Sequence, residues 1–92
     1  MTELVYAPDF LEDIDWLRKN NRKLFEKVRD LALDVAKHPT NGLGKPERLR
    51  YCDSVVYSRR IDKKNRLVYE IVNTKCVKML RCLNHYNDRR FF

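Results

Sequence analysis

The stretch VVYSRRIDKKNRLVYEIV, residues 55 to 72, has the pattern of a β-hairpin. Its two halves, VVYSRRI (55–61) and RLVYEIV (66–72), are rich in β-branched and aromatic residues, and successive side chains alternate in character. Both properties are typical of strands, and the link DKKN has the length of a hairpin connection. The stretch therefore predicts two antiparallel neighbours in one sheet.

The flanking segments extend this sheet. CVKMLRCLNHY (76–86) follows after the short link NTK and predicts a third antiparallel strand. TELVY (2–6) is short and β-prone, and ERLRY (47–51) adds a further short strand.

Two amphipathic helices are expected between the strands TELVY (2–6) and ERLRY (47–51). Pro8 and Asp9 suit the start of a helix, and Asn20-Asn21 interrupts the helical pattern before a second helix that ends at His38-Pro39. Each helix carries one apolar stripe: Phe10, Ile14 and Leu17 in the first, and Leu24, Val28, Leu31 and Val35 in the second. We expect an α+β fold of order β-α-α-β-β-β, with an optional extra strand. Its two N-terminal helices cover one face of a sheet of four or five strands and leave the other face free.

Length and composition predict one domain, residues 1–92. No apolar run approaches the length of a membrane span, and the N-terminus is too acidic for a signal peptide. The three cysteines, Cys52, Cys76 and Cys82, are odd in number and lack C-x-x-C spacing, so we expect reduced thiols rather than disulfides or a zinc site. A soluble, intracellular protein without a membrane partner is expected.

Positive charge is concentrated in the second half of the chain. Residues 1–40 hold seven Lys/Arg and eight Asp/Glu, whereas residues 41–92 hold thirteen and five, within a total net charge of +7. This asymmetry predicts a neutral scaffold joined to a surface that binds a polyanion, although a basic surface kept only for solubility explains it equally well. Strand arginines beside tyrosines would suit single-stranded RNA, because phosphates meet Arg and bases stack on Tyr.

Three side chains in this basic half have the chemistry for RNA cleavage without a metal. That reaction needs a base for the 2′-hydroxyl proton, a cation at the phosphate and an acid for the leaving 5′-oxygen. Glu47, Arg66 and His85 supply these groups, and Tyr86 stands beside the histidine. Taken singly, each of these residues is more often structural than catalytic. His38, at a helix end, is interpreted as a capping residue.

The ordered motifs GKPERL, SRRI, RLVYEI and HY closely resemble the YoeB/Txe branch of the RelE-type bacterial toxins over nearly the whole chain. This resemblance implies a RelE-like fold and an mRNA interferase that cuts the codon in the ribosomal A site. The catalytic residues that it implies are Glu47, Arg66, His85 and Tyr86. The RNA-binding residues that it suggests are Lys45, Arg48, Arg50, Tyr57, Arg59 and Arg60, with Arg59 favoured over Arg60 for phosphate contact.

The resemblance also implies partners, namely the 70S ribosome with its mRNA and a YefM-like antitoxin whose acidic segment covers the basic face. A homodimer, operator DNA bound through the antitoxin, a bacterial cytoplasmic location and no cofactor are further expectations. Residues 87–92, NDRRFF, extend beyond the family's terminal HY. The alternative from a different functional class is a non-catalytic RNA-binding or co-repressor subunit that acts with an antitoxin.

Overall fold

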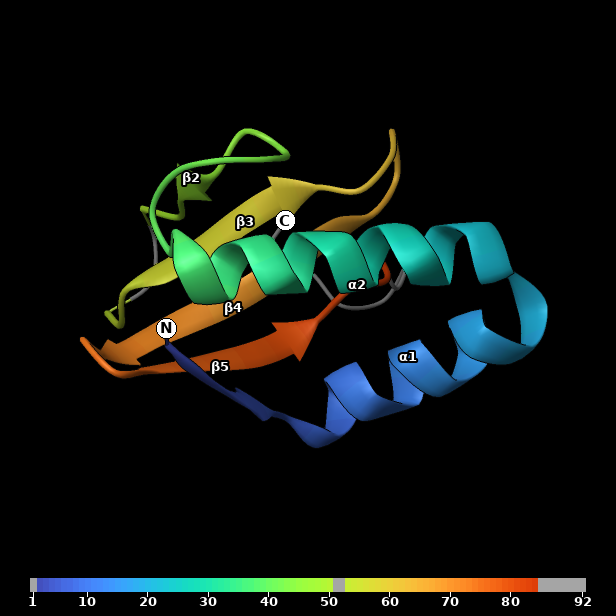
Figure 1. The fold of residues 1–92 in the computed structure, drawn as a ribbon, viewed down its shortest axis with the longest axis horizontal. Helices are drawn as coiled ribbons and strands as arrows, with labels where there is room; N and C mark the ends of the chain where they lie inside the picture. The colour runs from blue at the N-terminus through green and yellow to red at the C-terminus, as the bar shows by residue number, and fades with distance from the viewer. Residues whose placement is uncertain (1, 51–52, 85–92) are drawn as a thin grey trace.

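The computed structural model describes residues 2–50 and 53–84, and within them five strands form one mixed sheet. The strands are β1 (Glu3–Tyr6), β2 (Glu47–Arg48), β3 (Val56–Arg60), β4 (Arg66–Asn73) and β5 (Cys76–Arg81), in the spatial order β1-β5-β4-β3-β2. β1 pairs in parallel with β5, and the other neighbours are antiparallel (Figure 1). The predicted order and the extra short strand are both confirmed.

Two helices, α1 (Pro8–Asn20) and α2 (Arg22–Lys37), form the second layer, with α2 lying along the sheet (Figure 1). Asn21 separates them. Its backbone N–H donates to the Leu17 carbonyl at the end of α1, and its side chain accepts a hydrogen bond of 3.1 Å from the Leu24 N–H at the start of α2. One asparagine thus ends one helix and caps the next, which keeps the connection tight.

The hydrophobic core lies between the helices and the sheet, where the predicted stripes meet alternate strand residues. Its buried members come from α1, α2, β4, β5 and the ends of β3 and β5: Phe10, Leu17, Val28, Leu31, Val35, Ile61, Leu67, Tyr69, Val77, Met79 and Cys82. Because side chains alternate across a strand, Tyr57, Arg59 and Ile61 share this inner face with Tyr69 and Leu67, their neighbours on β4.

The opposite face of the sheet is less open than expected. It carries Val56, Ser58 and Val68, which are nearly inaccessible to solvent, whereas Arg60 on the same face is exposed. The free, RNA-facing surface predicted from the sequence is therefore confined to part of this face.

The remaining expectations concern particular segments. The last strand ends at Arg81, earlier than the predicted 76–86, and Tyr51, Cys52 and residues 85–92 lie outside the described residues. Within the described ranges, neither helix has the length and apolar character of a membrane span.

Candidate active site

Glu47, Arg60 and Arg66 lie on the same face of the sheet, opposite the helices. In the strand register Glu47 is level with Ser58 and Ser58 with Val68, and Arg60 is level with Arg66. Residues directly opposite each other on paired strands point to the same face. Two strand spacings and two residues along the strand separate the Glu47 and Arg66 backbones by about 12 Å, so both side chains can reach one phosphodiester between them.

A polar hydrogen-bonded chain brings the exit of β5 to the start of β4. The Asn84 N–H donates to Asn65 Oδ1 at 2.9 Å, and Asn65 is itself fixed by Asp62, whose Oδ1 accepts from the Asn65 N–H at 2.7 Å. Burial acts to raise the pKa of Asp62, but the N–H groups of Asn65 and Lys64 outweigh it and lower that pKa. Asn65 precedes Arg66 and Asn84 precedes His85, so the chain neighbours of two predicted catalytic residues are hydrogen-bonded to each other.

Asp13 of α1 also binds the segment that follows β5. Its Oδ2 accepts hydrogen bonds from the backbone N–H groups of Cys82 at 2.9 Å and Leu83 at 3.1 Å, and the residue is only 3% exposed. Asp13 was not among the predicted site residues. The signal that could have identified its role is its spacing from Phe10 and Leu17, which puts it on the buried side of α1.

The predicted acid and its neighbour, His85 and Tyr86, lie outside the described residues, as does the extension 87–92. Their roles stay predictions.

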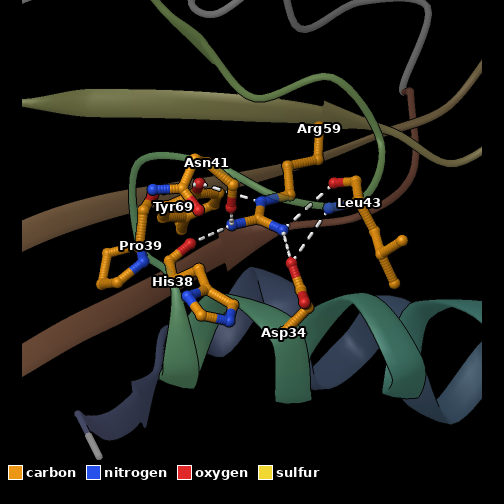
Figure 2. Close-up of polar contacts among 7 residues, drawn as sticks. All are labelled: Asp34, His38, Pro39, Asn41, Leu43, Arg59 and Tyr69. Atoms are coloured by element: carbon orange, nitrogen blue, oxygen red, sulfur yellow. Dashed lines mark hydrogen bonds and ion pairs between the residues drawn. The ribbon is translucent and has the colours of Figure 1, made fainter.

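Arg59 has a place different from the one expected. Its side chain is fully buried between α2, the loop 38–46 and β4 (Figure 2). The guanidinium donates to Asp34 Oδ2 and to the carbonyls of His38, Asn41 and Leu43, while Nε donates to the Tyr69 hydroxyl. The expectation that Arg59 contacts phosphate disagrees with this placement, because every donor faces the protein interior.

The alternation of side chains contained the signal for this correction. Tyr57 and Arg59 alternate with Ser58 and Arg60, so they share the inner face with Ile61. Tyr57 is half-buried there, stacked on Tyr69 with ring centroids 6.0 Å apart. Of the two adjacent arginines, Arg60 is the one on the outer face, level with Arg66.

The other predicted RNA-binding residues surround Glu47. Lys45, Arg48 and Arg50 are exposed, and the segment Pro46–Arg50 lines a hollow in the surface. Arg48 is level with Tyr57, so its side chain leaves the strand on the side away from Glu47. Lys45 and Arg50 flank the Glu47 strand in the chain, and all three cations contribute positive charge around this carboxylate.

Two further features of residues 2–50 and 53–84 bear on the chemistry, namely the arrangement of possible metal ligands and the burial of Cys82. No group of three His, Cys, Asp or Glu side chains within these ranges is arranged to hold a metal ion. Burial raises the pKa of the Cys82 thiol well above its usual range, with the nearby Asp13 carboxylate acting in the same direction, so Cys82 is a protonated core residue.

Comparisons with known proteins agree with this architecture. Residues 6–86 match the model of the YoeB-like toxins of bacterial type II toxin–antitoxin systems. A Synechocystis protein named Toxin YoeB is 36% identical over 80% of this chain and 85% of its own length. A YoeB/ParE toxin from Agrobacterium tumefaciens superimposes with a TM-score of 0.83 at 31% identity, covering 94% of this chain and 100% of that one.

A third relative is known together with a partner. In the YoeB–YefM complex from Staphylococcus aureus, the matching chain is 32% identical, has a TM-score of 0.80, and covers 94% of this chain and 99% of its own. The family match spans both helices, all strands after the first and the loop that leads to Glu47. This chain therefore belongs to the YoeB-like toxins of bacterial type II toxin–antitoxin systems.

Proposed function

We propose that the protein is a ribosome-dependent endoribonuclease that cuts mRNA in the A site of the 70S ribosome in the bacterial cytoplasm. Glu47 accepts the 2′-hydroxyl proton, and the 2′-oxygen attacks the adjacent phosphorus. Arg66 stabilises the charge that develops on the phosphate oxygens, and His85 donates a proton to the departing 5′-oxygen. Tyr86 orients the phosphate or stacks on a base. The products are a 2′,3′-cyclic phosphate and a 5′-hydroxyl end.

The observation that carries this proposal is the common face of Glu47, Arg60 and Arg66. A carboxylate among cations would weaken a site that only held anions, whereas it has a purpose as a base beside a phosphate that those cations hold. The hydrogen bond between Asn65 and Asn84 supports the third role, because it draws the residue before His85 towards the strand that begins with Arg66. Arg60 replaces Arg59 as the second phosphate contact, since Arg60 is exposed.

The proposed inhibitor is a YefM-like antitoxin with an acidic segment. The charge of residues 41–92, thirteen Lys/Arg against five Asp/Glu, suits such a partner. The Staphylococcus aureus relative is known as a YoeB–YefM complex, which supports the same assignment. Contact with operator DNA is proposed to occur through the antitoxin, and a homodimer stays a prediction of the family resemblance.

The proposal is tested by mapping new 5′ ends on an mRNA translated by purified 70S ribosomes, with wild type, Glu47→Gln and Arg60→Gln. We expect the wild type to cut inside A-site codons and to leave a 5′-hydroxyl. Glu47→Gln should slow cleavage by at least about 100-fold, because a general base contributes roughly 10²–10⁴-fold. The variant should still bind the ribosome–mRNA complex as the wild type does. Arg60→Gln should weaken binding and reduce its salt dependence by about one counterion.

The non-catalytic alternative predicts a different pattern. If the wild type binds the ribosome but cuts no mRNA, and Arg60→Gln loses binding, the basic face is a binding surface only. The chain would then act as an RNA-binding or co-repressor subunit. If Glu47→Gln cuts as fast as the wild type, Glu47 is not the general base and the proposed mechanism fails.

A further inference from the structure

We infer that Arg59, held by Asp34 and Tyr69, is a positioning residue that fixes the loop 38–46 and thereby sets the place of Glu47 on the RNA-facing side. This inference rests on the proposed function for its catalytic consequence. The anchoring of the loop is a property of the fold that can be measured independently.

The guanidinium of Arg59 uses all of its donors within the protein. A guanidinium has five N–H groups in a planar fork. Here Nε donates to the Tyr69 hydroxyl at 3.1 Å, Nη1 to Asp34 Oδ2 and the Leu43 carbonyl, and Nη2 to the carbonyls of His38 and Asn41 (Figure 2). Three backbone carbonyls of one loop thus converge on a single side chain.

Asp34 and Tyr69 complete this anchor from two different elements. Asp34 Oδ2, on α2, accepts from Arg59 Nη1 at 2.5 Å and from the Leu43 N–H at 3.0 Å. The Tyr69 hydroxyl, on β4, donates to the Pro39 carbonyl at 2.6 Å. The Arg59 hydrogen bond, with that of Leu43, lowers the pKa of Asp34, so the carboxylate stays charged opposite the buried cation. The loop is therefore tied to the helix layer and to the sheet at once.

The backbone of the loop is shaped to fit around this anchor. Gly42 has φ +109°, and a Cβ at that position would lie 2.1 Å from Asp34 Oδ2 and 3.4 Å from Arg59 Nη1. Gly44 has φ +78°, and its carbonyl accepts from the Arg60 N–H at 2.7 Å. Both glycines adopt the left-handed region that side chains disfavour. The loop can approach the Asp34–Arg59 pair closely only because Gly42 lacks a side chain.

The loop leads directly to Glu47. Only Lys45 and Pro46 stand between Gly44 and β2, which is two residues long. A strand of two residues forms few hydrogen bonds with its neighbour. Just after β2, the Leu49 N–H donates to the Val56 carbonyl of β3 at 2.8 Å. The position of Glu47 along the sheet therefore depends on the segment before it. An error of about 1 Å in a catalytic group can cost 100-fold in rate.

Substitutions that separate charge from geometry test the inference. Arg59→Lys keeps a cation for Asp34 but has three donors on a flexible stem, so it cannot hold three loop carbonyls. Tyr69→Phe keeps the buried ring and removes only the hydroxyl that links Arg59 to Pro39. Gly42→Ala disturbs the anchor without changing any of its donors or acceptors. Val28→Ala, in the core of α2, serves as a control for destabilisation alone.

Two readouts distinguish positioning from stability, namely single-turnover cleavage of A-site mRNA on 70S ribosomes and hydrogen exchange of the segment 40–50. All variants are compared at a temperature where each is fully folded by circular dichroism. We expect Arg59→Lys and Gly42→Ala to lower the maximal cleavage rate by about 10- to 100-fold and Tyr69→Phe by about 10-fold, with less than threefold change in half-saturating ribosome concentration. In these three variants hydrogen exchange should accelerate more in residues 40–50 than in the rest of the chain. Val28→Ala should show neither the rate loss nor this local acceleration.

The opposing results are equally defined. Equal rate losses in Tyr69→Phe and Val28→Ala, or exchange that accelerates uniformly over the chain, would overturn the positioning role. If the wild type and Glu47→Gln cleave alike, the proposed function fails instead. In that case, accelerated exchange confined to 40–50 still supports the anchor, and uniform exchange still refutes it.

Discussion

Replacing Asp13 should lower the free energy of unfolding by more than a substitution at an exposed helix position does. Its carboxylate accepts the backbone N–H groups of Cys82 and Leu83, and Cys82 is fully buried. Asp13→Ala leaves both donors without this acceptor, and each unsatisfied buried group costs about 1–3 kcal/mol. Because Leu83 is only half-buried, we expect about 3 kcal/mol in total. For a domain of this size that loss lowers Tm by roughly 12–24 °C.

A graded series makes this prediction sharper. Asp13→Asn keeps an oxygen acceptor in the same place and loses only the charge assistance, so about 1 kcal/mol is expected. Glu12→Ala, at the exposed neighbouring acid of α1, should change the free energy of unfolding by less than about 0.5 kcal/mol. Urea unfolding followed by circular dichroism gives all three values from the midpoint and slope. If Asp13→Ala costs no more than Glu12→Ala, these hydrogen bonds do not stabilise the exit of β5.

Two further predictions concern titratable groups. Arg59 and the Leu43 N–H lower the pKa of Asp34, so as the pH falls its carboxylate is protonated in the unfolded chain before it is protonated in the folded one. The stabilisation of the fold by the ionised Asp34 is therefore complete above about pH 5 and is lost as the pH falls through the unfolded pKa of about 3.9 and below it. Asp34→Asn should therefore flatten the decline of unfolding free energy between about pH 5 and pH 2, whereas the exposed Asp30→Asn should keep the wild-type slope; equal slopes in all three proteins would count against the ion pair. Iodoacetamide at pH 8 should label the half-buried Cys76 at least about 10-fold faster than Cys82 in the native protein, and labelling of Cys82 at the same rate as in urea would show that its burial is wrong.

Most of the fold could be predicted because it follows local patterns. The apolar stripes of the helices and the alternation of residues 55–72 each report which side of an element is buried, and turn lengths fix the antiparallel neighbours. The end of β5 was misjudged. CVKMLRCLNHY contains no Gly or Pro that would end the strand at Arg81, but Cys82 and Leu83 donate their N–H groups to Asp13, 69 and 70 residues earlier, instead of to a neighbouring strand. Local periodicity contains no information on such a partner.

In the candidate site, too, local patterns indicated some features, while partners distant in the chain determine others. The motifs suggested Glu47, Arg60 and Arg66 as site residues, and these roles stay predictions. The hairpin of residues 55–72 predicts that Arg60 and Arg66 lie close together, whereas the pairing of Glu47 with Ser58 comes from β2 and could not be read from the hairpin. Arg59 was misassigned because adjacent arginines look alike in a motif, although they point to opposite faces of a strand. The partners that make its burial tolerable, Asp34 and the loop carbonyls, lie up to 25 residues away in the chain.

Each helix uses one carboxylate to hold an irregular segment next to a strand of the sheet: Asp13 the segment after β5, and Asp34 the loop before β2. Burying a charge is costly unless it is paired and hydrogen-bonded, so the buried Asp13 and Arg59 both need polar partners where they lie. Segments that leave a sheet lose their ladder partners, and their N–H and C=O groups must be satisfied in another way. Asp13 satisfies donors at the exit of β5, and Asp34 fixes the arginine that satisfies acceptors before β2. In the proposed mechanism the base and the acid follow these two segments. In that mechanism the helix layer would position both groups without touching RNA, and substitutions confined to the basic face would not reveal this positioning role.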